Sequence, residues 1–200
     1  MVWNGILLGG GGAVILLIVW YFFAIARPGQ FPGEQTITNE GSGHISSRNP
    51  DGTPTGARPS FLHYPPSSGQ HYGDLVAPWG VYTTTSAVPL PSSALNFDIL
   101  AVEGVYVHNL EHGGVVFLYN CPTACPELEQ QFVDMYANAP TDITFNSKKI
   151  LVLPYDASRM DGSPIIALAW GHQWNMTAFD ETNMIRWYQR FVNKGPELVP

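Results

Sequence analysis

The sequence predicts an α+β protein, with a single N-terminal transmembrane helix and a compact domain whose open, mostly antiparallel sheet is covered by two helices. Three observations predict this. The first 26 residues carry no charged side chain. Beyond residue 100, four short runs of β-branched and aromatic residues are bounded by turn residues, and two longer stretches have helical spacing. These elements do not follow a strict βαβ order, which favours an α+β over an α/β domain.

Residues 1–26 predict a transmembrane anchor. An uncharged apolar run covers residues 6–26, with Trp3 at one edge and Trp20 near the other. At about 1.5 Å per residue it is long enough to cross a hydrocarbon core of about 30 Å. The alternative is a cleaved signal peptide, because residues 24–26 (AIA) resemble a cleavage site. Against this alternative, no basic residue precedes the run, and the run is longer than the usual apolar core of a signal peptide.

The composition of the remaining chain favours a domain outside the cytoplasm. It has few charges, much Pro, Gly, Ser and Thr, and one closely spaced cysteine pair, which suits an oxidising compartment. We therefore expect a single-pass protein of the bacterial cytoplasmic membrane, in contact with the lipid bilayer and with its domain on the periplasmic or extracellular side. The net charge of −7, without a basic stripe, argues against nucleic acid as a partner.

The chain divides into the anchor (residues 1–26), an extended polar linker (residues 27–60) and the extracytoplasmic domain (residues 61–200). Residues 27–60 are rich in Gly, Pro, Ser and Thr and have few large apolar side chains. Such a stretch cannot bury enough surface to fold alone, so it is either a linker or extended chain that lies over another surface. From Phe61 onwards, aromatic residues become frequent.

The secondary structure of the domain is predicted from local patterns. Strands are expected where short runs of β-branched and aromatic residues lie between turn residues, at 104–108, 114–119, 149–154 and 164–170. One helix is expected over 126–138, because it has Pro126 in its first turn, early acidic residues and apolar residues near helical spacing. A second helix is expected over 180–193, with Asp180 as its N-cap.

Histidines form the first group of candidate ligands. His71 follows the segment YPPSSGQ, and His108 and His112 lie four residues apart in HNLEHGG. We expect a strand before His108 and the end of any helix at Gly113–Gly114, so that a single helical turn is available. One turn is enough to aim both rings at one ion, with His71 as a third ligand. Neutral imidazole suits zinc, copper, iron or nickel, and one copper or zinc ion is the cofactor that we consider.

Glu111 lies next to this histidine pair and has two possible roles beside a metal. It can act as a general base, or it can orient a ligand ring through a hydrogen bond. Two metal-free alternatives stay open: histidines that bond backbone carbonyls in a loop-rich core, and an acid–base catalytic site. The sequence contains neither a G-x-S-x-G elbow nor a phosphate-binding glycine loop between a strand and a helix, so no catalytic residue is predicted.

Cys121 and Cys125 lie in the segment CPTACP, between an expected strand and an expected helix. A helix N-terminus favours the thiolate of Cys125. The segment resembles the copper-binding loop of the Sco-type copper chaperones, which are also anchored by one helix. In that family the copper histidine lies far downstream in a thioredoxin fold, whereas only His172 follows Cys125 here. We prefer a disulfide between Cys121 and Cys125 to a redox or copper-binding pair.

The order of four segments, PPSSGQHY, GVYVHNLEHGGVVFLY, ILVLPY and IALAWG, is similar to a bacterial family known as domain of unknown function 3105. The similarity covers residues 61–193, and HNLEHGG is its most specific part. The resemblance implies one N-terminal anchor, a polar linker and an extracytoplasmic domain. It also implies that His71, His108, Glu111 and His112 belong to the family pattern. It implies no reaction.

Four consecutive glycines, Gly9, Gly10, Gly11 and Gly12, lie inside the expected anchor. Glycine lets another transmembrane helix approach closely, although it is also simply commoner in membrane helices. We therefore favour a non-catalytic accessory subunit that packs against other transmembrane subunits of a larger complex. The complex that we expect is a respiratory or photosynthetic electron-transfer assembly, capped on its extracytoplasmic side. The alternative is a periplasmic protein that handles copper or zinc, and a third hypothesis is a metal-dependent hydrolase.

Overall fold

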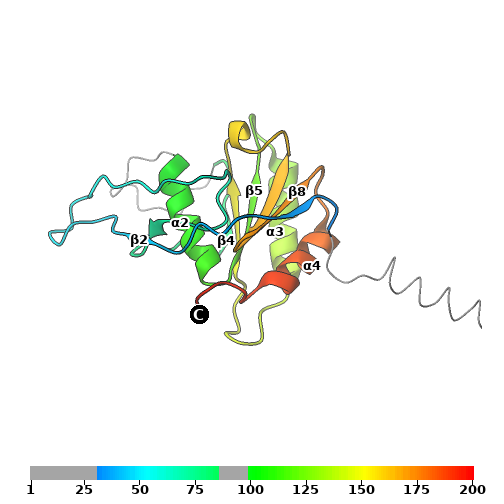
Figure 1. Cartoon of the computed structure of the whole chain (residues 1–200). Helices are drawn as coiled ribbons and strands as arrows, with labels where there is room; N and C mark the ends of the chain where they lie inside the picture. Colours follow the sequence, from blue (N-terminus) through cyan, green and yellow to red (C-terminus); the bar gives the residue numbers. More distant parts are fainter. Residues whose placement is uncertain (1–30, 86–98) are drawn as a thin grey trace, which may run out of the picture. The chain divides into compact units, whose positions relative to one another are not determined.

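The computed structural model describes residues 31–85 and 99–200, in which helices cover both faces of a mixed sheet (Figure 1). The strands are β1 (Glu34–Thr36), β2 (His44–Ile45), β3 (His71–Tyr72), β4 (Gly80–Val81), β5 (Val115–Tyr119), β6 (Ile150–Pro154), β7 (Ile165–Ala169) and β8 (His172–Met176). The α-helices are α2 (Ile99–Glu111), α3 (Pro126–Asn138) and α4 (Glu181–Phe191), and a short 3₁₀ turn, η1, covers Ala157–Arg159.

The main sheet has the strand order β1-β8-β7-β5-β6-β4. The neighbours from β1 to β5 are antiparallel, whereas β5, β6 and β4 run parallel to one another, so the sheet is mixed. Parallel neighbours need a crossover connection, and α3 provides it between β5 and β6. The strands β2 and β3 form a separate parallel pair, in which His44 lies opposite His71.

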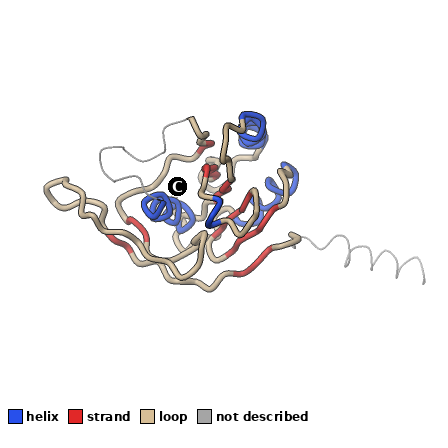
Figure 2. The backbone as a smooth tube through the Cα atoms, turned by 90° about the horizontal axis from the view of Figure 1, so that it is seen from above, coloured by secondary structure: helices blue, strands red, loops and turns tan. Residues whose placement is uncertain are grey.

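Alternation along the three central strands creates two apolar cores. Val116 and Leu118 of β5 face α2, together with the corresponding residues of β6 and β7. Val115, Phe117 and Tyr119 face the other way, towards α3 and α4. Successive side chains of a strand point to opposite faces, so strands that are apolar throughout can be covered on both sides. Figure 2 shows the helices on either side of the strands.

Two of the helices agree with the sequence prediction. The helix α3 has the predicted bounds, with Pro126 in its first turn. The helix α4 begins directly after Asp180, whose side chain accepts a hydrogen bond from the backbone N–H of Asn183 at 3.1 Å and caps the helix. The described residues contain three α-helices, one more than the two expected. The additional helix, α2, covers the second face of the sheet.

The strand expected over residues 104–108 is wrong, because this segment belongs to α2. Val105, Tyr106 and Val107 are all at most 2% exposed. A helix that is buried on most sides has no exposed polar face, so its sequence loses the 3.6-residue period. Periodicity alone cannot distinguish such a helix from a buried strand, and the β-branched and aromatic residues then favoured the strand.

Part of the stretch that we expected to be a linker packs within the domain. The described residues from Phe31 to Pro200 form one compact unit, and β1 pairs with β8 at the edge of the main sheet. The ring of Phe31, which is 7% exposed, lies 4.8 Å from that of Trp174 and 5.2 Å from that of Trp187, between ring centroids. Strand pairing uses backbone groups, so a polar stretch can join a fold whose apolar core other segments provide.

No helix in residues 31–85 and 99–200 combines the length and the apolar character that a membrane crossing requires. The expected anchor, residues 1–26, and its glycines, residues 9–12, lie outside the described residues.

Candidate metal centre

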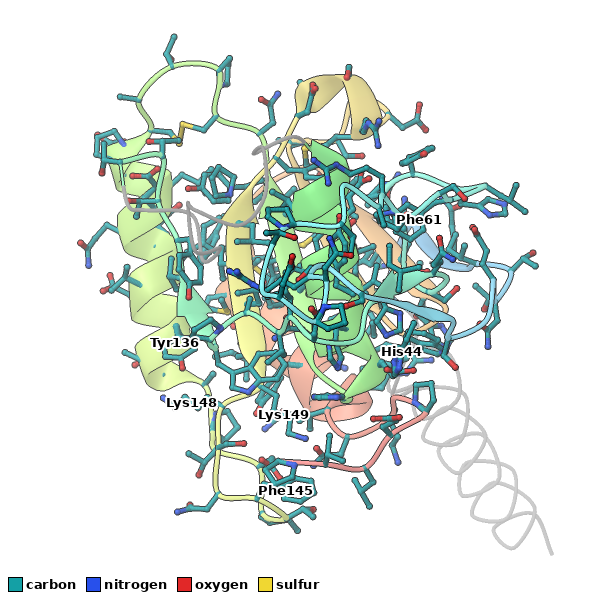
Figure 3. The ribbon with its side chains drawn as sticks, turned by 90° about the vertical axis from the view of Figure 1, so that its left-hand side faces the viewer. His44, Phe61, Tyr136, Phe145, Lys148 and Lys149 are labelled. Atoms are coloured by element: carbon teal, nitrogen blue, oxygen red, sulfur yellow. A yellow bond between two sulfur atoms is a disulfide. The ribbon has the colours of Figure 1, made fainter. Side chains whose placement is uncertain are left out.

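Three histidines and one glutamate from three different parts of the chain meet at the C-terminal end of α2. His44, His71, His108 and Glu111 each offer one ligand atom, and these four atoms all lie within 4.8 Å of one another. Figure 3 shows His44 next to the ribbon of α2. The Nε2 atoms of His44 and His71 both lie 2.9 Å from Oε2 of Glu111.

The parallel pair of β2 and β3 brings the first two histidines together. The backbone N–H of His71 donates to the carbonyl of Gly43 at 2.9 Å, and that of Gly73 donates to the carbonyl of Ile45 at 3.0 Å. A side chain at position 73 would place its Cβ 2.9 Å from Cγ of His44. Glycine at this position therefore leaves room for the His44 ring to lie against β3.

The glycines of HNLEHGG end α2 directly after Glu111. Gly113 has a φ of +74°, its N–H donates to the carbonyl of Leu110, and the N–H of Gly114 donates to the carbonyl of Asn109. This pair of bonds is the Schellman motif that terminates helices at a glycine. His108 and Glu111 lie three residues apart on the last turn, so both side chains project from the same side of the helix.

Asn109 fixes the loop that faces the histidines. Its side chain is fully buried, accepts a hydrogen bond from the N–H of Ala77 at 2.9 Å and donates one to the carbonyl of Ala77 at 2.8 Å. Two residues earlier in that loop, the carbonyl of Leu75 accepts a hydrogen bond from Nδ1 of His108 at 2.8 Å. Asn109 is therefore a positioning residue, and the sequence held no signal for it beyond its place in HNLEHGG.

Hydrogen bonds determine which nitrogen of two rings carries the proton. Nδ1 of His71 lies 2.8 Å from the carbonyl of Gly69, and because a carbonyl only accepts, Nδ1 holds the proton. In a neutral His71, Nε2 therefore carries a lone pair and no proton. This acceptor nitrogen faces the carboxylate of Glu111, which is also an acceptor. His108 has the same arrangement, with its Nδ1 committed to a carbonyl. Histidines that bind metals in proteins typically donate their second N–H in this way.

The pKa values favour a neutral ring at His108 and a charged carboxylate at Glu111. Burial is the main cause that lowers the pKa of His108, and the fields of His71 and His44 lower it further. Burial acts in the opposite direction on Glu111, but the contacts of its carboxylate with the rings of His44 and His71 hold its pKa below the usual value. A neutral imidazole and an ionised carboxylate are the forms that bind metal ions.

The contacts of Glu111 with His44 and His71 are close to the ligand spacing of a tetrahedral metal site. Ligands that lie about 2.0–2.1 Å from a tetrahedral zinc ion are about 3.3 Å apart, a few tenths of an ångström more than the 2.9 Å contacts of Glu111. Three imidazoles and one carboxylate suit zinc, copper(II), nickel or iron, and no thiolate is present to favour copper(I). The side chains of His71 and Glu111 are at most 2% exposed, whereas that of His44 is 46% exposed.

The structure unites two of the three histidines that the sequence singled out. His71 and His108 belong to the group, but His112 is the residue after the last helical position of α2 and lies in a neighbouring group. Its Nε2 lies 3.5 Å from Oε2 of Glu197. His44 takes the place expected for His112, and Glu111 offers an oxygen to the centre itself. Nothing in the polar stretch around His44 marked it as a ligand.

The cysteine pair lies at a different point of the fold. Cys121 and Cys125 form a disulfide between the end of β5 and the start of α3. Ligand atoms of both cysteines and of Glu129 lie within 4.8 Å of one another. His172, the only histidine after the pair, lies on β8, and its ring is 4.6 Å from that of Phe191 between centroids. Among the described residues, no group of metal-ligating side chains combines these cysteines with a histidine.

Comparison with known proteins identifies the domain by family. A family model described as "Protein of unknown function (DUF3105)" matches residues 54–199. No curated protein and no solved structure gives a match. The matched segment contains His71, His108 and Glu111, whereas His44 lies before it.

Proposed function

This chain belongs to the DUF3105 family, whose description names no activity, and we therefore propose a function from the site alone: the domain binds a transition-metal ion, zinc(II) or copper(II). The ligands are His44, His71, His108 and Glu111. The observation that carries the proposal is the position of the buried Nε2 lone pair of His71, which faces a carboxylate oxygen at 2.9 Å. A cation between these two acceptors turns a repulsive contact into two coordinate bonds.

A metal-free centre is costly in this environment. Without a metal, the contact of His71 with Glu111 requires an imidazolium or a protonated carboxyl group. The His71 side chain is fully buried, and taking a charged ring out of water costs several kcal/mol before its partner repays it. His44 approaches the same oxygen at 2.9 Å, and its neutral ring can donate to it from Nε2, so the conflict lies between His71 and Glu111. A divalent cation removes this conflict, because both rings then bind in their neutral form.

The ligand set supports metal binding and transfer rather than catalysis. Four protein ligands fill a tetrahedral ion, whereas catalytic zinc sites keep one position for water or substrate. Three of the ligands are buried on α2 and β3, while the half-exposed His44 comes from the edge of the domain. We infer that the ion enters and leaves on the side of His44. This is the behaviour expected of a protein that handles copper or zinc.

Metal content tests the proposal. The full-length chain, purified in detergent, is stripped of metal, loaded with Zn²⁺ or Cu²⁺, washed, and measured by elemental analysis. We expect a tightly bound ion that His71→Ala loses, and an affinity at least about tenfold weaker in His44→Ala. His63→Ala is the matched control, because His63 has the same 46% exposure as His44 and contacts Glu40 at 2.9 Å. A wild-type chain without metal, or equal metal content in His71→Ala and His63→Ala, would contradict the proposal.

The accessory-subunit hypothesis concerns another part of the chain. It rests on residues 9–12, which lie outside the described residues, and it stays a prediction, as do the membrane anchor and the extracytoplasmic location. Metal binding and complex membership are compatible, because a bound ion can also stabilise a subunit. Extraction in mild detergent followed by native sizing tests the hypothesis, and migration of the chain alone at its own mass counts against it.

A further inference from the structure

A second group of metal-ligating side chains adjoins the proposed centre. Glu111, His112 and Glu197 each offer one ligand atom, and these three atoms lie within 4.8 Å of one another. Glu111 belongs to both groups. The rings of His108, in the first group, and His112, in the second, are 4.4 Å apart between centroids. The two groups are therefore adjacent at the end of α2, with one shared carboxylate.

The C-terminal tail is fixed on both sides of Glu197. The backbone N–H of Glu197 donates to the carbonyl of Glu111 at 3.0 Å. Gly195 packs so closely that a Cβ at this position would lie 2.1 Å from the same carbonyl. The ammonium group of the fully buried Lys149 donates to the carbonyl of His112 at 3.0 Å and also to that of Val199. These contacts hold the Glu197 backbone against the end of α2.

We propose that Glu111, His112 and Glu197 form a second metal position, and that Glu111 bridges two ions in a dinuclear centre. The inference deepens the proposed function and rests on it, because Glu111 also serves the first position. A carboxylate has two oxygens with about four lone-pair sites, so it can bind two cations at once. In two-metal sites the ions are about 3.5–4 Å apart, a separation that one bridging carboxylate spans.

The second position has a different chemical character from the first. It offers one imidazole and two carboxylates, a harder ligand set that suits zinc, nickel or manganese. Three protein ligands leave at least one position for water or an external ligand. The Glu197 side chain is 44% exposed, so this ion exchanges faster than the buried one.

Titration of the metal-free, full-length chain with Zn²⁺ tests the second position. We expect two sequential binding events, the second at least about tenfold weaker than the first. Glu197→Gln and His112→Ala remove the second event and keep the first. Glu127→Gln, a control on the exposed side of α3, keeps both events. Loading with two equivalents of Cu²⁺ gives an independent readout, because ions that share one carboxylate couple magnetically and lose intensity in electron paramagnetic resonance.

The outcomes separate this inference from the proposed function. A single binding event that His71→Ala removes and Glu197→Gln leaves intact overturns the second position, while the proposed function stands. Two binding events that Glu197→Gln and His112→Ala do not change also overturn it. Two copper ions with full, uncoupled signal intensity overturn the bridging role of Glu111. The absence of any binding event in the wild-type chain removes both proposals.

Discussion

His44 and His71 lie opposite each other in the register of two very short parallel strands, and both point Nε2 at the same oxygen of Glu111. The two strands contribute only two residues each, and so short a ladder has little stability of its own. The pair is instead held by its surroundings, including Asp74, which accepts hydrogen bonds from the N–H and the hydroxyl of Ser47. The centre and the local fold therefore depend on each other.

Metal binding should raise the thermal stability of the domain. At a free Zn²⁺ concentration of about 100 times Kd, a ligand specific for the folded state adds about 2.7 kcal/mol. For a domain of this size, that corresponds to an increase in Tm of about 5–10 °C. Differential scanning calorimetry with and without Zn²⁺ measures the change, and a chelator should reverse it. His71→Ala should abolish the shift, whereas His63→Ala should keep it. A shift that persists in His71→Ala would point to binding elsewhere.

Removal of the cysteine pair should lower stability without changing metal content. The disulfide joins residues four apart, and a crosslink over so short a loop contributes about 2 kcal/mol. We expect a loss of this order for the double variant Cys121→Ser and Cys125→Ser in urea unfolding. Elemental analysis should find the same metal content as in the wild-type chain, because the proposed ligands are histidines and Glu111. Loss of the metal in this variant would instead favour the copper-binding role of the cysteines.

Gly104→Ala should destabilise the domain, although alanine is the better helix former. A Cβ at position 104 of α2 would lie 2.7 Å from the ring of Tyr72 and 2.9 Å from Pro59. Helix propensity favours alanine by about 1 kcal/mol, but overpacking of a core costs about 1–3 kcal/mol. We expect a net loss of up to about 2 kcal/mol in urea unfolding. We also expect weaker Zn²⁺ binding, because Tyr72 directly follows His71.

Gly43→Ala is the matched control for this prediction, because a Cβ at position 43 meets nothing within 4 Å and the residue is not in the left-handed region. Its unfolding free energy should stay within about 0.5 kcal/mol of the wild type. A stability of Gly104→Ala equal to that of Gly43→Ala would show that α2 does not approach β3 this closely.

Asp142 should make the domain sensitive to acid. Burial opposes its ionisation, but hydrogen bonds from Thr144, Phe145, Ser147 and Asn193 lower its pKa from 3.8 to about 2. Because the folded-state pKa lies below the unfolded one, the contribution is complete above about pH 4 and is lost as the pH falls towards 2. A shift of this size is worth about 2 kcal/mol.

Asp142→Asn removes the charge and tests this pH dependence. At pH 7 the variant should unfold with about 2 kcal/mol less free energy than the wild type, and the difference should shrink as the pH falls from 4 to 2. Asp134→Asn, at an exposed position of α3, should show little change at any pH. Unfolding in urea at several pH values measures both. A difference that is constant with pH would mean that the loop needs the shape of the side chain and not its charge.

Local signals in the sequence were sufficient for two helices. Pro126 and the Asp180 cap lie within a few residues of the structure that they determine, so α3 and α4 were predicted with bounds close to those observed. The α2 helix was missed, because its burial depends on elements far away in the chain and its sequence lacks a polar face. The β1 strand was missed for a related reason, since backbone pairing with β8 leaves no mark on its side chains.

In the candidate centre, too, local sequence signals indicated some residues and missed others. The segment HNLEHGG indicated His108 as a ligand and Glu111 as a residue beside the metal, because residues three apart on one helical turn are close in the sequence, but it also indicated His112, which lies in the neighbouring group. His44 lies 67 residues before Glu111 in the sequence, and Glu197 lies far after it. Neither residue belongs to a short motif that contains Glu111. Ligands brought together only by tertiary structure are not visible in a local pattern.

The position of His44 before the family match has a practical consequence for work on related chains. A fragment that starts at residue 54 contains the whole matched segment and three of the four proposed ligands, but it lacks β2. Such a fragment would present a metal ion with an open coordination position in place of His44. Its water-exposed ion would have the coordination of a hydrolytic zinc centre. Any hydrolase activity found in the fragment should therefore be checked again in the complete chain before it is attributed to the protein.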